Sequence, residues 1–433
     1  MTNRERSLGY IVFLSFVAAI GGILFGYDTA VISGTTEIVK AQFGLSTGLE
    51  GWFVGCALIG SIIGVMVAGM LSDFLGRKKT MLITALMFSV SAIGCAVCGN
   101  FSQLVVYRMI GGFGIGVVSI VSPIYISEVA PAEKRGTLVS LYQLFITIGF
   151  LLAYLMNYLI LRGAATDATG TELGTRMFNQ EYWRGMFGCE AIPDLLFLVL
   201  IFFIPESPRW LAIRGQRQDK SEEWKALREP GILKAVLVGS AIAILGQFMG
   251  VNAVLYYGPK IFQDAGLSGE GSMFSTVLVG VVNMLTTVIA LLIIDKVGRK
   301  QLVWWGVGGM IVCLLCIGTW FAVGTLPTWF LLTFFLLYVF CTAISISAVV
   351  FVLLSEMYPN RVRGLAMSIA GLALWVGTYL IGQLTPWMLE NLTPAGTFFL
   401  FAFCCLPYLY IMWKYIPETT GRTLEEIEAY WKK

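Results

Sequence analysis

Two residues of opposite charge lie inside stretches of sequence that are otherwise apolar. Asp28 falls within residues 10–32, and Arg108 falls within residues 103–127. Because a charge inside an apolar segment is costly, we treat both as candidates for function. If the two segments touch, the carboxylate and the guanidinium form a buried pair, and separation of that pair lets Asp28 bind a proton. The alternative is an ion pair with a purely structural role.

Two further acids, Glu190 and Asp194, lie four residues apart and therefore share one face of a helix predicted over residues 184–204. Asp194 falls near the middle of that stretch. Three interpretations of Asp194 stay open: a second protonatable site, a partner for an arginine, or a tolerated charge that faces a cavity.

The composition predicts the elements that position these charges. Hydrophobic residues make up 57% of the 433 residues and charged residues only 13%, whereas soluble chains carry about 25% charge. Apolar runs of about twenty residues recur, the length that crosses a membrane. Since backbone groups in lipid must bond within their own segment, we expect an all-α membrane protein. The twelve predicted transmembrane helices are residues 10–32, 51–72, 80–99, 103–127, 137–161, 184–204, 232–262, 271–294, 301–323, 328–355, 365–389 and 396–416.

The lysines and arginines predict the orientation. Most of the 29 basic residues fall in segments on the same side as the N-terminus, and the side richer in basic residues faces the cytoplasm. We therefore expect a multi-pass protein of the cytoplasmic (inner) membrane with both termini in the cytoplasm. The net charge of +3 reflects this sidedness, so nucleic acid is not an expected partner.

Three charged strings occur twice, in the same order and at nearly one spacing. They are Asp73-x-x-Gly76-Arg77-Lys78 with Asp295-x-x-Gly298-Arg299-Lys300, Ser127-Glu128-x-x-Pro131-x-x-x-Arg135-Gly136 with Ser355-Glu356-x-x-Pro359-x-x-x-Arg363-Gly364, and Ile204-Pro205-Glu206-Ser207 with Ile416-Pro417-Glu418-Thr419. The chain is therefore predicted to be two pseudo-symmetric copies of one six-helix bundle. Repeats in one orientation are the plan of the major facilitator superfamily. The predicted parts are residues 1–204, a short cytoplasmic connector at 205–231, residues 232–418 and a tail helix at 419–433.

All three strings fall at predicted cytoplasmic helix ends, where acids and bases of different helices could pair. Networks of such pairs can bias an equilibrium between two conformations. We therefore predict a gate that holds the cytoplasmic side shut; the alternative is ordinary solvated loop charges. The predicted gate residues are Asp73, Arg77, Glu128, Arg135, Glu206, Arg209, Asp295, Arg299, Glu356, Arg363, Glu418 and Arg422.

The strings, extended to Pro205-Glu206-Ser207-Pro208-Arg209-Trp210-Leu211 and Pro417-Glu418-Thr419-x-Gly421-Arg422, resemble those of the sugar porter family. Residues 21–34, GGILFGYDTAVISG, are similar in particular to the bacterial D-xylose:proton symporters. The resemblance extends from the first span to the tail. It implies the major facilitator fold, contact between the helices of Asp28 and Arg108, and Asp28 as the protonation site.

The resemblance also implies a sugar site, which needs amides and hydroxyls beside aromatic faces. The residues that match polar or aromatic positions of that site are Gln143, Gln247, Asn252, Tyr256, Tyr257, Asn283 and Trp375. A buried amide is also common as a contact between helices. At four expected positions the chain differs, with Phe150, Gly246 and Leu374 in place of glutamines and Phe351 in place of a tryptophan. The affinity and the choice among D-xylose and similar pentoses or hexoses therefore stay open.

The repeat places Asp28 opposite Asn252, so one half has an ionisable group where the other has its neutral isostere. This asymmetry suits proton binding in the first half and sugar binding in the second. The predicted function is proton-coupled import of a monosaccharide by alternating access. A facilitative sugar uniporter and a non-transporting sugar sensor are the alternatives. No enzyme activity, cofactor or metal is expected, because no nucleophile–base set, metal cluster or nucleotide loop is found, and we expect a monomer.

Overall fold

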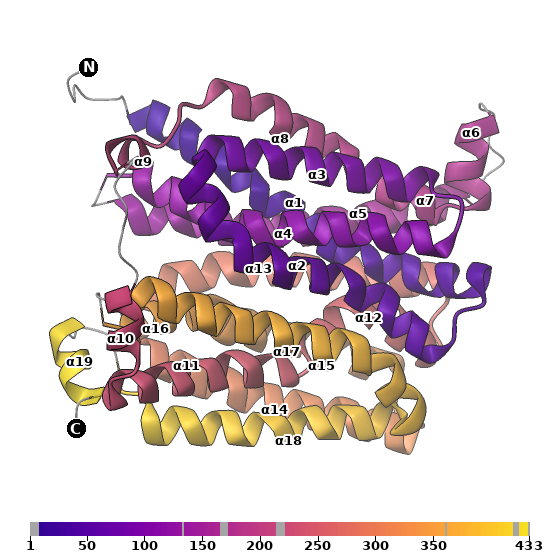
Figure 1. The fold of residues 1–433 in the computed structure, drawn as a ribbon. Coiled ribbons are helices and arrows are strands. Elements are labelled where there is room, and N and C mark those ends of the chain that lie inside the picture. Colours follow the sequence, from indigo (N-terminus) through magenta and orange to yellow (C-terminus); the bar gives the residue numbers. More distant parts are fainter. Residues whose placement is uncertain are drawn as a thin grey trace. The chain divides into compact units, whose positions relative to one another are not determined.

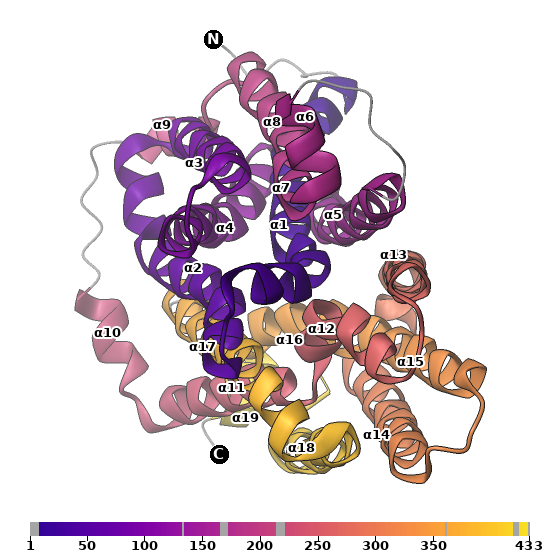
Figure 2. The ribbon, with the colours of Figure 1, turned by 90° about the vertical axis from the view of Figure 1, so that its right-hand side faces the viewer.

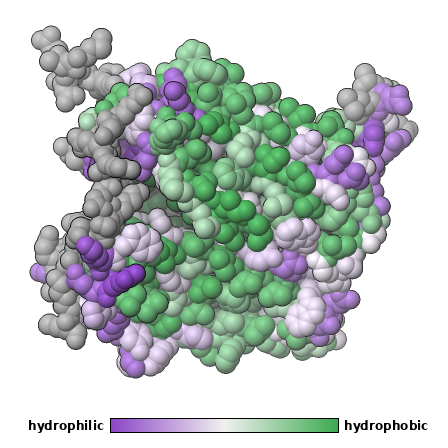
Figure 3. Space-filling model, viewed as in Figure 1, coloured by the Kyte–Doolittle hydropathy of each residue, from purple (hydrophilic) through white to green (hydrophobic). Residues whose placement is uncertain are grey.

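Long apolar helices dominate the computed structural model of this chain, which describes residues 8–131, 134–164, 172–213, 221–359, 362–418 and 424–431 (Figure 1). Twelve helical segments are long and apolar enough to cross a membrane, and all twelve predicted spans are confirmed. At 1.5 Å per residue, the shortest of them, with 21 residues, covers a hydrocarbon core of about 30 Å. Figure 3 shows hydrophobic residues along the helices and hydrophilic residues gathered toward their ends.

The chain divides into two compact units. Unit 1 comprises residues 1–46, 52–216 and 268–280, and unit 2 comprises residues 47–51, 217–267 and 281–433. The helices that begin the chain are α1 (Leu8–Phe43), α2 (Thr47–Leu75), α3 (Arg77–Val97), α4 (Phe101–Val129), α5 (Arg135–Ala164), α6 (Glu172–Thr175), the π-helical turn η2 (Arg176–Gln180), α7 (Trp183–Gly188), α8 (Ala191–Phe203) and α9 (Pro208–Ile213).

The remaining helices follow in the same way. They are α10 (Ser221–Leu227), α11 (Pro230–Phe248), α12 (Val251–Asp264), α13 (Gly269–Val297), α14 (Arg299–Val323), α15 (Thr328–Thr342), the π-helical turn η3 (Ala343–Ser347), α16 (Ala348–Met357), α17 (Arg363–Asn391), α18 (Thr393–Tyr415) and α19 (Leu424–Trp431). Figure 2 shows many of the long helices nearly end-on.

Glycines allow the helices of unit 1 to pack with their backbones close together. A Cβ on Gly26 of α1 would lie 2.1 Å from the carbonyl oxygen of Ile146 on α5, and one on Gly149 would lie 2.3 Å from that of Ile23. Between α2 and α4, a Cβ on Gly112 would lie 1.9 Å from the carbonyl oxygen of Ala57. Such contacts leave no room for a side chain. These glycines therefore bring α1 against α5 and α2 against α4, and α1 also packs against α4.

In unit 2, one predicted span is broken. The sequence predicts one helix over residues 232–262, but α11 ends at Phe248 and α12 begins at Val251. Gly250 between them adopts the left-handed conformation, with φ +89°, which costs a glycine little. The hydroxyl of Tyr338 on α15 donates to the carbonyl oxygen of Met249 at 2.7 Å. The break is therefore an ordered feature of the helix, held by a hydrogen bond from α15.

Candidate functional site

The structure brings Asp28 and Arg108 together in the interior of unit 1. Their exposed fractions are 1% and 2%. Arg108 Nη1 donates to Asp28 Oδ1 and, at 3.2 Å, to the backbone carbonyl oxygen of Asp28. Asp28 Oδ2 and Arg108 Nε have no hydrogen-bond partner among the described residues. The pair is thus buried, and Arg108 binds only one of the two carboxylate oxygens of Asp28.

The packing around this pair is tight. A Cβ on Gly111, one turn after Arg108, would lie 2.9 Å from Asp28 Oδ2 and 2.5 Å from Ser91 Oγ. On the other side, the guanidinium carbon of Arg108 lies 5.3 Å from the centre of the Phe187 ring, a cation–π contact. A low-dielectric surrounding of this kind strengthens the attraction between the two charges.

The two further acids also lie in the interior of unit 1. Glu190 directly precedes α8 and is 2% exposed, and Asp194 in the first turn of α8 is 0% exposed. Both oxygens of Asp194 have no hydrogen-bond partner among the described residues. The sequence interpretation of Asp194 as a partner for an arginine is therefore not supported by a contact in the described part of the chain.

A polar cluster in unit 2 is built around the break in span seven. Asn252 Nδ2 donates to Gln247 Oε1 at 2.6 Å, so the two amides meet across Gly250. Thr378 of α17 completes the cluster, because its hydroxyl donates to Gln247 Oε1 at 3.2 Å. Trp375 lies about one turn before Thr378 on the same helix and is 7% exposed. Amides, a hydroxyl and an aromatic ring therefore come from neighbouring segments of α11, α12 and α17.

The other predicted sugar-binding residues have different surroundings. The Tyr257 hydroxyl donates to the carbonyl oxygen of Gly382 at 2.8 Å and so joins α12 to α17. Tyr256 is 2% exposed. Asn283 of α13 lines a small cavity of about 30 Å³ together with Tyr338, Thr342 and Ser347. Gln143 lies on α5 in unit 1 and is partly exposed.

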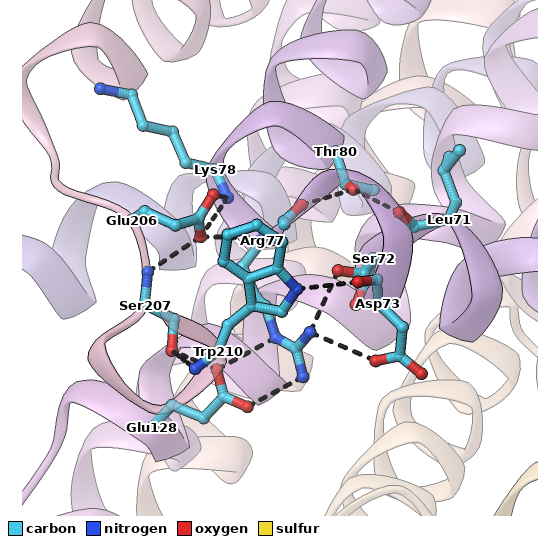
Figure 4. Close-up of polar contacts among 11 residues, drawn as sticks. Leu71, Ser72, Asp73, Arg77, Lys78, Thr80, Glu128, Glu206, Ser207 and Trp210 are labelled. Atoms are coloured by element: carbon cyan, nitrogen blue, oxygen red, sulfur yellow. Dashed lines mark hydrogen bonds and ion pairs between the residues drawn. The ribbon is translucent and has the colours of Figure 1, made fainter. Parts of the chain in front are cut away.

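The amino-terminal charged strings form one cluster, shown in Figure 4. Arg77 of α3 donates Nη2 to Glu128 Oε1 at 3.0 Å and Nε to Glu128 Oε2 at 3.1 Å, a bidentate pair. Its Nη1 donates to Asp73 Oδ1 at 3.2 Å. Glu206 accepts from the backbone N–H groups of Arg77 at 2.9 Å and Ser207 at 2.8 Å. The ends of α2, α3 and α4 and the segment before α9 are thereby joined.

The carboxyl-terminal copy repeats the central contact of this cluster in unit 2. Arg299 Nη2 donates to Glu356 Oε1 at 3.0 Å, as Arg77 does to Glu128. Glu418 accepts from the backbone N–H of Lys300 at 3.3 Å, as Glu206 does at the start of α3. The side chain of Asp295 and all of Arg422 lie outside the described residues.

Three of the predicted gate arginines lie outside these two clusters. Arg135 and Arg209 are exposed and form no ion pair with any residue that the structure describes. Arg363 donates Nε and Nη2 to the backbone carbonyl oxygen of Tyr358, each at 3.3 Å. Among the described residues, Arg77 and Arg299 therefore bind carboxylates, whereas Arg135, Arg209 and Arg363 form no ion pair.

Sequence reasoning missed two groups of contacts. Thr378 was not singled out, because a threonine inside a span usually bonds its own helix, as Thr378 also does with Leu374 at 3.0 Å. A further buried arginine, Arg184, was also overlooked. It donates to Glu181 and, at 2.7 Å, to the carbonyl oxygen of Cys98. Its place beside Trp183 at the start of an apolar run was the only signal.

Glu181 lies between the spans and is the centre of this second group. Gln42 Nε2 donates to Glu181 Oε1 at 2.6 Å, and Arg176 Nε donates to Glu181 Oε2 at 2.8 Å. Desolvation acts against the charged carboxylate, but the hydrogen bonds and charges of Arg184 and Arg176 outweigh it and lower the pKa of Glu181 below its usual value. The group joins the end of α1 to the start of α7.

Comparison with known proteins identifies relatives over the whole length. The family profile described as "Sugar (and other) transporter" matches residues 14–230 and 216–431. The arabinose-proton symporter of Bacillus subtilis is 36% identical over 460 residues, covering 100% of this chain and 97% of the relative. The D-xylose-proton symporter of Escherichia coli is 36% identical over 488 residues, with 99% and 97% covered.

The fold is also similar to that of a solved transporter structure. The inward open conformation of the xylose transporter XylE from E. coli matches this chain with a TM-score of 0.83 and 36% identity, covering 98% of this chain and 100% of that one. The duplicated strings, the twelve spans and these matches agree, and the chain belongs to the sugar transporter family of the major facilitator superfamily.

Proposed function

We propose that this protein is a proton-coupled symporter that imports a monosaccharide, a pentose such as D-xylose or arabinose or a similar hexose, by alternating access. The observation that carries the proposal is the buried pair of Asp28 and Arg108 in unit 1. Relatives named as arabinose-proton and D-xylose-proton symporters, each 36% identical, support the substrate class.

The pair supplies the chemistry of coupling. While Asp28 is ionised, its charge and that of Arg108 cancel, and the interior of the bundle carries no net charge from them. A proton on Asp28 removes the attraction and frees Arg108 to change its partner. Since the pair joins α1 to α4, protonation loosens one helix contact at the centre of the bundle. The proton thereby biases the equilibrium between two conformations.

The sugar contacts are assigned mainly to unit 2. Gln247, Asn252 and Thr378 form a chain of donors and acceptors, and Trp375 adds an apolar face nearby. A broken helix at mid-span is a usual place for a substrate in transporters of this kind. We therefore keep the division of roles predicted from Asp28 and its counterpart Asn252. Protons bind in the first half of the chain and the sugar binds in the second. Gln143, Tyr256, Tyr257 and Asn283 stay in the proposed site.

The charged clusters are proposed to act as parts of the cytoplasmic gate. In each unit, an arginine that begins a helix binds a glutamate of another helix, Arg77 with Glu128 and Arg299 with Glu356. Each cluster therefore makes the helix ends of its own unit move together. A bundle whose ends are tied can rock as one body, as alternating access requires.

The remaining assignments follow from the same function. We place the protein in the cytoplasmic membrane with both termini in the cytoplasm, working as a monomer with a sugar and a proton as its partners. The halves are residues 1–204 and 232–418, joined by the connector 205–231 and followed by the tail 419–433.

Transport by the purified protein in liposomes tests the proposal. Radiolabelled pentoses and hexoses are offered with and without an imposed pH gradient, and external pH is recorded. We expect at least one sugar to accumulate against its gradient with alkalinisation outside. Asp28→Asn abolishes accumulation and spares sugar exchange. The matched control Glu172→Gln, an exposed acid of α6, leaves both unchanged.

Three other results would contradict the proposal. Accumulation by Asp28→Asn would show that the coupling proton binds elsewhere. Sugar equilibration that ignores the pH gradient in the unaltered protein would identify a uniporter. Binding of sugar without any transport would identify a sensor.

A further inference from the structure

Asp194 is a buried acid that the proposed coupling pair does not use. It lies in the first turn of α8, where Asp194, Phe197 and Ile201 form the buried face of the helix. The opposite face is exposed, with Ile192 at 69% and Phe202 at 62%. Phe197 reaches α1, because a Cβ on Gly21 would lie 3.5 Å from its ring. Asp194 therefore points into the bundle and not toward lipid.

No group among the described residues compensates a charge on Asp194. Both carboxylate oxygens are buried without a hydrogen-bond partner. The three buried arginines described in unit 1 are engaged elsewhere, Arg77 with Glu128, Arg108 with Asp28 and Arg184 with Glu181. An isolated ionised carboxylate in an apolar interior is so costly that such a group takes up a proton instead.

The neighbouring titratable groups add to this cost. Helix α8 packs against α1 and α3. From α1, Asp28 and Tyr27 lie within electrostatic reach of Asp194, and Glu190 lies one turn before it. From α3, Cys95 lies within electrostatic reach of Glu190. The basic Lys78 of α3 binds the carbonyl oxygen of Phe202, at the other end of α8.

We propose that Asp194 is a second proton-binding residue of the transporter, which holds its proton while Asp28 is paired with Arg108. In that state three carboxyl groups, those of Asp28, Glu190 and Asp194, are buried in unit 1, while Arg184 is engaged by Glu181. Only one carboxylate can be neutralised by Arg108. The proton on Asp194 keeps a second negative charge away from Asp28.

The two acids are then linked through their charges. When Asp28 accepts its proton, its negative charge no longer acts on Asp194 and Arg108 loses its partner. Both changes favour release of the proton from Asp194. The titrations of the two carboxyl groups are therefore coupled: proton uptake at Asp28 favours proton release from Asp194. The role of Asp194 in transport rests on the proposed proton-coupled symport.

Infrared absorption of the purified protein tests proton binding without any transport. A protonated carboxyl group has a C=O stretching band apart from that of a carboxylate. At neutral pH, we expect this band in the unaltered protein and its loss in the near-isosteric variant Asp194→Asn. Glu190→Gln is the matched variant one helical turn away, and it keeps the Asp194 band.

A second measurement tests the link to the coupling pair. In Asp28→Asn, the Asp194 band should disappear at a lower pH than in the unaltered protein, because a neighbouring negative charge is gone and Arg108 is unpaired. If Asp194→Asn does not fold, Asp194→Glu retains a carboxyl group and should displace the same band.

The proposal is overturned if the protonated band is unchanged in Asp194→Asn, or if only Glu190→Gln removes it. An unchanged titration of the band in Asp28→Asn would overturn the link between the two acids. These spectra need neither sugar nor a pH gradient. Failure of symport in liposomes would therefore leave them valid, and failure of the spectra would leave the Asp28 proposal standing.

Discussion

The side-chain amide of Asn252 donates to Gln247 Oε1 at 2.6 Å across the left-handed break at Gly250. The two residues are five apart, and in a continuous helix they would point in different directions. The break turns them toward each other and toward Thr378. The backbone conformation of one glycine thus assembles the polar cluster proposed to bind sugar.

Substitution of that glycine should destabilise the protein. In Gly250→Ala, the new Cβ would lie 2.4 Å from Phe401 Cδ2, and alanine disfavours φ +89°. We expect a loss of about 1–3 kcal/mol in the free energy of unfolding. Thermal unfolding in detergent measures it. Gly246→Ala is the matched control, since its Cβ meets Ile346 at an ordinary 3.6 Å. Equal stability of the two variants would contradict the role of the break.

The polar cluster should control sugar affinity and not coupling. Asn252→Ala removes the amide beside Gln247, and we expect a rise in KM of roughly tenfold, equivalent to about 1.4 kcal/mol. Thr378→Val keeps the shape of the side chain and removes one hydroxyl, so its effect should be smaller. Initial rates of labelled-sugar uptake give KM. Loss of proton coupling with unchanged KM would place Asn252 outside the sugar site.

The sequence predicted the elements better than the contacts. All twelve spans follow from run length and hydropathy, since an apolar segment of about twenty residues in lipid has one favourable conformation. The break at Gly250 was not predicted, because glycine is also common inside spans. The partners of Arg77 could be anticipated from repeated strings, but the exposed positions of Arg135 and Arg209 depend on local packing that spacing does not contain.

The bidentate pair of Arg77 and Glu128 should stabilise unit 1 strongly. Their side chains are 7% and 5% exposed, so Arg77→Ala leaves a buried carboxylate uncompensated. We expect a loss of about 3–5 kcal/mol. Arg77→Lys keeps the charge but cannot form both hydrogen bonds, and it should recover only part of the loss.

The exposed Arg135 is the control for this prediction. Because it binds no carboxylate among the described residues, Arg135→Ala should change the free energy of unfolding by less than about 0.5 kcal/mol. Thermal unfolding of the three variants in one detergent makes the comparison. If Arg77→Ala is no less stable than Arg135→Ala, the cluster does not stabilise the helix ends.

The group around Glu181 should make stability depend on pH on the acid side. Since its arginine partners lower the pKa of Glu181 in the folded protein, the unfolded state takes up a proton first as pH falls. The stabilising contribution is therefore complete above the unfolded pKa of about 4.3 and is lost as pH falls through the lower folded pKa. Glu181→Gln removes this contribution, and its unfolding temperature should fall less steeply with acidification.

Thermal unfolding between neutral and acidic pH, with Glu172→Gln as the control, measures this difference. The control keeps Glu181 and both arginines, so it should follow the unaltered protein. A parallel decline of all three proteins would mean that the bonds from Arg184 and Arg176 do not favour the charged carboxylate. Buried Arg184 would then require another source of compensation, for which the carbonyl oxygens of Ala96 and Cys98, at 3.2 and 2.7 Å, are in place.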